Sequence, residues 1–152
     1  SELLGGNINS LSLDDKVLEK SITLKTSFNN YLWEIEKTNN QKEKQKLIKR
    51  AKDVLAFYRD LDLSIKHCST YLKPNKYFIL VTGSRVVKNV KLNTDIICAE
   101  LAENYDFALD GMLYRKTIPK KRMPSRVSPS NITGDTAPTM TKESIVLLRK
   151  IF

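Results

Sequence analysis

The chain is poor in the side chains that bind metals or act as nucleophiles. It holds two cysteines, Cys68 and Cys98, and a single histidine, His67. These cannot supply a metal cluster with the usual number of ligands, so we expect no metal site. His67 and Cys68 are neighbours on a predicted helix, where adjacent side chains point in different directions, so they are badly placed to act as base and nucleophile. Both cysteines are expected to be small buried apolar side chains.

The sequence also has no long hydrophobic run, and we expect no signal peptide. No apolar stretch approaches the roughly 20 residues needed to cross a bilayer, so we expect a soluble, cytoplasmic protein with no membrane partner. The 152 residues, 41% of them hydrophobic, suit one globular domain with a core. The chain begins at Ser1 and not at Met. We therefore expect it to have been trimmed or cut from a longer polypeptide.

Acidic residues are scarce at one end of the chain. Residues 111–152 hold nine Lys or Arg and two acidic residues, a balance of +7, whereas residues 1–110 hold 17 basic and 15 acidic residues, a balance of +2. The densest stretch, RKTIPKKRMPSR at 115–126, has six cations, two prolines and no acid. Clustered cations on a proline-stiffened segment are typical of a surface that binds a polyanion, and they favour nucleic acid as the partner. The alternative is a basic region that only aids solubility.

Residues 1–72 are predicted to be mainly helical. Asp14 and Asp15 could begin a helix near Lys16. Apolar residues from 47 to 72 follow one helical face at i, i+3, i+4 spacing up to Lys73-Pro74. The polar run 38–46 is either a turn or an exposed first turn of that helix. Tyr31 and Trp33 are expected to pack in the core and not to stack on bases.

Residues 73–152 are predicted to add a sheet to the same domain. The run YFILV at 77–81 is apolar on both faces, which favours a buried strand in a sheet covered by helices. A helix is expected from Asn93 or Thr94 to about Glu103, and strands at 107–116 and 143–150. Residues 117–141 show no periodicity and hold four prolines, so we expect a long loop. The three strands should be neighbours, with the last antiparallel to both others.

The loop and the last strand carry a series of short motifs. In chain order they are Ile118-Pro119, Lys121-Arg122-Met123-Pro124, Ser128-Pro129-Ser130-Asn131, Gly134, Thr139-Met140 and Glu143. Together with LKPNKYFILVTGS upstream, this series resembles the C-terminal portion of bacterial S-adenosylmethionine-dependent DNA methyltransferases that modify an exocyclic amino group. The resemblance is strong over about residues 72–150 and weak over residues 1–71.

The resemblance implies an α/β fold: part of a class I methyltransferase-like (Rossmann-like) sheet with its last strand antiparallel, behind a helical N-terminal region. It also implies double-stranded DNA as partner and S-adenosylmethionine as cofactor of the complete enzyme. The family's Phe-x-Gly-x-Gly donor turn and its Pro-Pro-Tyr or Pro-Pro-Trp catalytic loop are absent. We therefore expect no catalytic residue here and no cofactor on this chain alone. A missing N-terminal half or a partner subunit would supply both.

An enzyme that methylates a base amino group rotates the base out of the duplex, and phosphates on both sides must be held meanwhile. The predicted DNA-binding residues lie in and beside the basic loop, 115–141: Arg115, Lys116, Lys120, Lys121, Arg122, Arg126, Ser128 and Asn131. Gly83 and Ser84 follow a strand, so they could line a cofactor or target pocket, or form a plain turn. Tyr114 lies where the family builds its base pocket, although a core or surface role is an equal alternative.

Two other functions remain open from the sequence. The chain could be a non-catalytic DNA-binding subunit that completes a partner, or a stand-alone basic nucleic-acid-binding module. The residues do not distinguish adenine N6 from cytosine N4 as the methylated atom.

Overall fold

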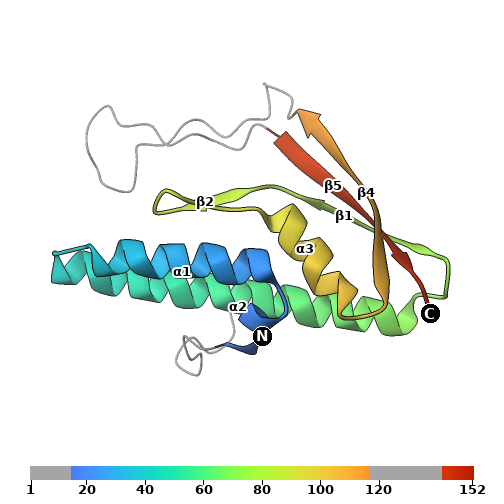
Figure 1. Ribbon diagram of the computed structural model, residues 1–152, viewed down its shortest axis with the longest axis horizontal. Helices are drawn as coiled ribbons and strands as arrows, with labels where there is room; N and C mark the ends of the chain where they lie inside the picture. Colours follow the sequence, from blue (N-terminus) through green and yellow to red (C-terminus); the bar gives the residue numbers. More distant parts are fainter. Residues whose placement is uncertain (1–14, 117–141) are drawn as a thin grey trace.

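The computed structural model of the chain describes residues 15–116 and 142–152 (Figure 1). A long helical hairpin lies beneath a sheet, with a third helix between them. A short 3-10 turn, Lys16–Glu19, precedes three helices: α1 (Ile22–Glu36), α2 (Gln41–Tyr71) and α3 (Thr94–Glu103). The strands are β1 (Tyr77–Thr82), β2 (Arg85–Val87), β3 (Val90–Leu92), β4 (Phe107–Lys116) and β5 (Lys142–Lys150).

The last strand is the centre of the main sheet. Its order is β1-β5-β4, and β5 pairs antiparallel with both neighbours. This confirms the predicted arrangement of the three strands. The mixed α/β class is likewise confirmed, whereas the methyltransferase-like form of the sheet stays a prediction. A separate two-stranded hairpin, β2–β3, follows β1 and was not predicted.

Local capping fixes where the first helices begin. Asp15 accepts a hydrogen bond from the Val17 amide at 3.1 Å, but the turn that it caps ends at Glu19. The Ser21 hydroxyl then caps α1 by accepting from the Leu24 amide at 3.0 Å. Asn40 caps α2, so the end of the polar run at 38–46 forms the exposed first turn of that helix. The predicted single helix from Lys16 is therefore two pieces.

The core lies between one face of the sheet and the helices. Alternate residues of β5, including Val146 and Leu148, are fully buried on this face, as the two-residue period of a strand requires. They belong to one cluster with Ile97 and Leu101 of α3 and Phe107 of β4. The predicted apolar stripe of α2 also faces this core through Ala51, Val54, Leu55, Tyr58 and Ile65, all buried.

The prediction for β1 was wrong in its burial. Tyr77, Ile79 and Val81 are each more than half exposed, and the strand alternates between exposed and half-buried residues. Because β1 is an edge strand of an antiparallel sheet, only one of its faces meets the helices among the described residues.

Two further burial predictions need correction. Trp33 is 58% exposed, with the ammonium of Lys37 2.9 Å from its ring centroid. Tyr31 is buried as predicted, and its hydroxyl donates to the Leu47 carbonyl at 3.0 Å. Cys98 is buried as well, which raises its thiol pKa to about 12, whereas Cys68 is only half-buried. Cys68 lies near the C-terminal end of α2. This helix is about twice as long as α1, and its C-terminal part extends beyond α1 (Figure 1).

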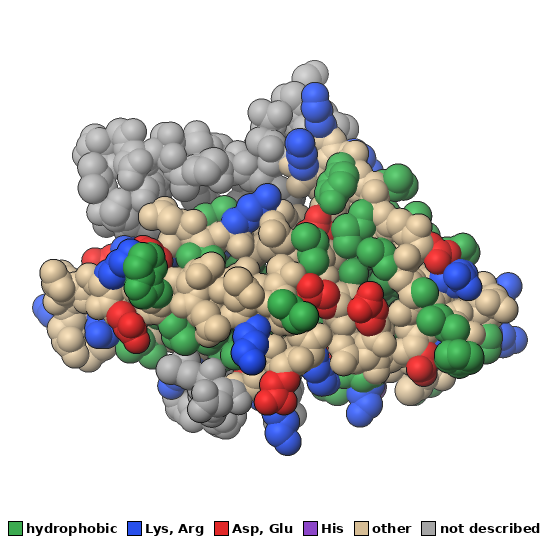
Figure 2. All heavy atoms as spheres, in the orientation of Figure 1, with side chains coloured by type: hydrophobic (Ala, Val, Ile, Leu, Met, Phe, Trp, Pro, Cys, Tyr) green, Lys and Arg blue, Asp and Glu red, His purple; other side chains and the backbone are tan. Residues whose placement is uncertain are grey.

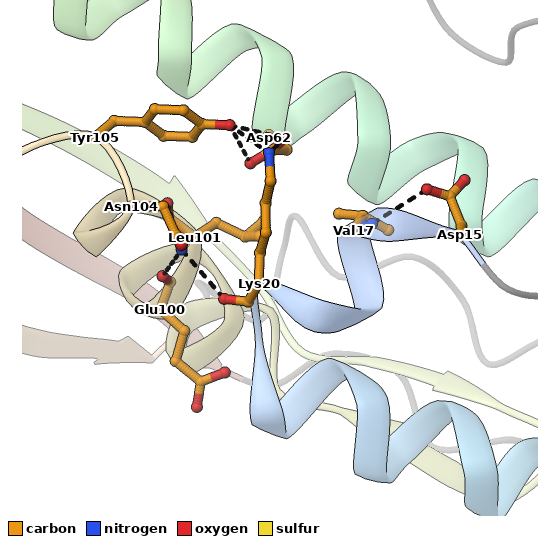
Figure 3. A network of polar contacts seen from close by, with 8 residues as sticks. All are labelled: Asp15, Val17, Lys20, Asp62, Glu100, Leu101, Asn104 and Tyr105. Carbon is orange, nitrogen blue, oxygen red and sulfur yellow. Dashed lines mark hydrogen bonds and ion pairs between the residues drawn. The ribbon is translucent and has the colours of Figure 1, made fainter.

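A polar network ties the N-terminal turn to α2 and to the loop after α3 (Figure 3). The Lys20 ammonium donates to Asp62 Oδ2 at 2.5 Å and to the Tyr105 hydroxyl at 2.6 Å, and Tyr105 donates to Asp62 at 2.9 Å. Burial lowers the Lys20 pKa, but the bonds to Asp62 and Tyr105 outweigh it and raise that pKa overall.

Among the described residues, no helix is long and apolar enough to cross a membrane.

Candidate nucleic-acid interface

One end of the main sheet brings together every predicted site residue that the structure describes. Thr82, the last residue of β1, pairs with Ser144 of β5, and Ser144 pairs with Tyr114 of β4. Gly83 and Ser84 continue from β1, while Arg115 and Lys116 finish β4. We call this region the basic sheet end: residues 82–85, 114–116 and 142–144.

Two lysines face each other at the tip of the basic sheet end. Lys116 and Lys142 are direct partners on antiparallel strands, and both are exposed. Like charges opposite each other on neighbouring strands destabilise a sheet. No acidic group within the described residues forms an ion pair with either lysine. An anion bound between the two ammonium groups would remove this repulsion.

The next pair inward has opposite charges. The Arg115 Nε donates to Glu143 Oε2 at 3.0 Å, and a terminal guanidinium nitrogen donates to the same oxygen. The Arg115 side chain remains largely exposed. Glu143 therefore partly neutralises the charge of Arg115. Lys116 and Lys142 are the two cations at the tip that form no ion pair within the described residues.

A buried polar contact holds the sheet end in place from below. The Ser144 hydroxyl donates to Asp95 Oδ2 at 2.9 Å, and both residues are buried. Beside them, the hydroxyls of Tyr58 and Thr94 are 3.0 Å apart, and burial raises the pKa of Tyr58 to about 12. These bonds join the first turn of α3 and the middle of α2 to the sheet. Lys116 and Lys142 therefore project from a sheet end that buried hydrogen bonds hold against α2 and α3.

Tyr114 occupies an exposed position at this end. It is 64% exposed, and its hydroxyl lies 3.9 Å from the sulfur of Met112 on the same face of β4. Gly83 and Ser84 are half-buried and lead directly into Arg85, an exposed cation at the start of β2. Tyr114 is thus available to a ligand, while Gly83 and Ser84 form the connection between β1 and the hairpin.

The remaining predicted ligands belong to the segment that joins β4 to β5. Lys120, Lys121, Arg122, Arg126, Ser128 and Asn131 lie outside the described residues. The structure does fix where that segment starts and stops, because Lys116 and Lys142 are partners across an antiparallel pair. Their Cα atoms are therefore roughly 5 Å apart. The segment between them has four basic residues and one acidic residue in its sequence.

Sequence reasoning missed Lys142, Asp95 and Ser144. Lys142 stands directly before the last strand, but only the strand register shows that it faces Lys116. Asp95 stands in the first turn of α3, where an acidic residue is ordinary. No group of three potential metal ligands lies together in the parts of the chain that the structure describes.

The comparisons with known proteins agree with the resemblance drawn from the motifs. The chain is 46% identical over 101 residues to the type II methyltransferase M.MvaI of Kocuria varians. The match covers 66% of this chain and 22% of that protein, so the chain spans about a fifth of its relative's length. No family model matches the chain, and no solved structure matches it. The resemblance to a DNA methyltransferase is thereby confirmed.

Proposed function

We propose that this chain, a relative of part of a type II methyltransferase, is the C-terminal, DNA-binding part of a site-specific DNA methyltransferase. In the complete enzyme a methyl group would pass from S-adenosylmethionine to a base amino group. The observation that carries the proposal is the basic sheet end, where Lys116 faces Lys142 and a strongly basic segment joins them. A phosphate backbone is the polyanion that this arrangement fits.

Each residue of the site has a distinct part in the proposal. Lys116 and Lys142 bind phosphate from the rigid sheet, while the cations of the joining segment, Lys120, Lys121, Arg122 and Arg126, bind phosphates farther along the duplex. Ser128 and Asn131 donate hydrogen bonds to phosphate or to base edges. Tyr114, with Gly83 and Ser84 nearby, lines the pocket for the extruded base. Holding phosphates on both sides of that base keeps the duplex in place during extrusion.

In this proposal the turn that binds the methyl donor and the catalytic loop belong to a different part of the enzyme. The chain has neither a Phe-x-Gly-x-Gly turn nor a Pro-Pro pair, and about four fifths of its relative's length has no counterpart here. Those missing parts would come from the rest of the polypeptide or from a partner subunit.

The chain alone is therefore expected not to bind S-adenosylmethionine. Isothermal titration calorimetry of the purified chain should show no saturable heat at micromolar to near-millimolar cofactor. Saturable binding in the micromolar range would contradict the proposal that the S-adenosylmethionine site lies in another part of the enzyme, and it would reveal a donor site within this chain.

The proposed function is tested by complementation. M.MvaI with its 101 matched residues deleted would be mixed with this chain, and transfer of a radiolabelled methyl group from S-adenosylmethionine to DNA would be measured. We expect the mixture to methylate DNA and each component alone to be inactive. DNA binding by the mixture without any methyl transfer would favour the stand-alone nucleic-acid-binding module.

A further inference from the structure

A second surface of the main sheet is apolar and uncovered among the described residues. Ile79 and Val81 of β1 are 55% and 59% exposed, and Leu113 of β4 is 55% exposed. Between them, Ile145 and Leu147 of β5 are half-buried. We call these five residues the open sheet face. Figure 2 shows hydrophobic side chains at the surface where β1, β4 and β5 lie in Figure 1.

Strand register makes the five side chains one continuous patch. Ile79 pairs with Leu147, and Val81 and Leu113 both pair with Ile145, from opposite sides. Directly paired residues point to the same face of a sheet, so the patch extends across all three strands. The helices α2 and α3 lie against the opposite face, which holds Val146 and Leu148. A contiguous exposed apolar patch of this kind marks an interaction surface.

Charged groups border the patch at both ends. At one end Asp110 accepts hydrogen bonds from Arg149 and from the Tyr77 hydroxyl, both at 2.9 Å. At the other end lies the Arg115–Glu143 pair. An apolar centre with a polar border is the usual anatomy of a protein interface.

The two edge strands of the sheet differ in how far they permit pairing with a further strand. The β4 edge carries Asp110, a register shift between Leu109 and Gly111, and two cations at its end, all of which discourage further strand pairing. The β1 edge, YFILVT, has no charge, no proline and no bulge, and among the described strands it pairs only with β5. An unprotected edge beside an uncovered face indicates that the sheet is completed on the β1 side by another segment of chain.

We propose that the open sheet face and the β1 edge are the docking surface for the remainder of the methyltransferase, which covers the face with an apolar helix surface and extends the sheet beyond β1. This inference rests on the proposed function. The choice of occupant rests on the length of the relative. The match covers only 22% of that protein, so most of a methyltransferase is available to cover the open sheet face. The free face of an antiparallel sheet is normally polar, so apolar side chains on this face indicate a covering layer that the described residues do not supply.

Gly111 gives the occupant room to approach. It lies opposite Leu147 in the middle of the patch, and a Cβ at this position would meet only the Leu147 side chain, at 3.8 Å. The described part of the chain therefore does not require glycine here for space. A glycine at this position carries no side chain that would hold the partner's backbone away from the sheet.

The test measures association of this chain with M.MvaI that lacks its matched residues, by sedimentation velocity. Ile79→Lys with Leu113→Lys puts two charges in the patch and should weaken the complex at least about 100-fold, because the ammonium groups would be buried without partners. The matched control, Ile22→Lys with Leu63→Lys, changes exposed apolar residues on α1 and α2, and should alter affinity by less than about threefold. Circular dichroism should show both variants folded.

Three results would overturn the proposal: no complex with the unmodified chain, equal weakening by both double variants, or a self-associated chain that only the Ile79→Lys/Leu113→Lys variant makes monomeric. The last result would identify a second copy of this chain as the occupant. A complex that forms through the patch but transfers no methyl group would retain the docking surface and reject the proposed function.

Discussion

Leu148→Ala is expected to lower the free energy of unfolding by about 2–5 kcal/mol, whereas Leu147→Ala should cost no more than about 1 kcal/mol. The two leucines are neighbours on β5 and differ in which face of the sheet they occupy. Leu148 is fully buried against the core, so its removal leaves a cavity. Leu147 is half-buried on the open sheet face, where water or neighbouring side chains can fill the space.

Urea unfolding of both variants, followed by circular dichroism, measures this difference directly. Residue type, strand and secondary structure are matched, so the difference reports which face of the sheet is buried. Equal destabilisation would mean that the open sheet face is covered within this chain, and the docking surface would then be lost as well.

Asp62→Ala is expected to lower the free energy of unfolding by about 2–3 kcal/mol, because hydrogen bonds to charged groups contribute about 1.5–3 kcal/mol and their loss strands the remaining partners. Asp62 accepts from both Lys20 and Tyr105, and it is largely buried. The removal leaves a partly buried ammonium and hydroxyl without their common acceptor. Asp53→Ala on the same helix changes an exposed carboxylate and should cost less than about 0.5 kcal/mol.

The pH dependence separates the charge of the network from its packing. The Lys20 pKa is raised above its ordinary 10.5, and burial raises the Tyr105 pKa above its ordinary 10.0. Both groups therefore contribute stability that is fully present below those ordinary values and is lost as pH rises through the folded pKa. The difference between the original chain and Asp62→Ala should be constant from neutral pH to about pH 10 and should shrink above it. A difference that grows with alkaline pH would contradict the assigned protonation.

The elements that the sequence predicted best are those whose residues interact mostly within one segment. The stripe on α2 and the bounds of α3 follow from helical spacing and from Asn93, which occupies the cap position. The antiparallel orientation of the last strand followed from the sequence of the segment that joins it to β4, which shows no helical periodicity. The β2–β3 hairpin was missed because its turn uses Lys88 and Asn89 at positive φ, and no glycine marks it.

The burial of β1 could not be predicted because its cover is not set by β1 itself. The run YFILV has the same hydrophobicity whether helices cover both faces or one. Its exposed residues, Ile79 and Val81, have the composition of a buried strand in a place where this chain supplies no cover among the described residues. The basic sheet end shows the same limit, since Lys142 becomes part of the site only through its pairing with Lys116.

The most direct measurement of the central claim is the salt dependence of DNA affinity, followed by fluorescence anisotropy of a labelled duplex between 25 and ~200 mM salt. Lys120→Ala, Lys121→Ala and Arg122→Ala would be combined in one variant. The control combines Lys42→Ala, Lys44→Ala and Lys46→Ala on α2, with the same change in net charge. If the basic segment contacts duplex phosphates, the first variant flattens the slope of log affinity against log salt by about 0.9 per lost contact, up to ~2.7, and the control leaves it nearly unchanged. Equal losses in the two variants, or an original chain that does not bind the duplex at low salt, would contradict the account.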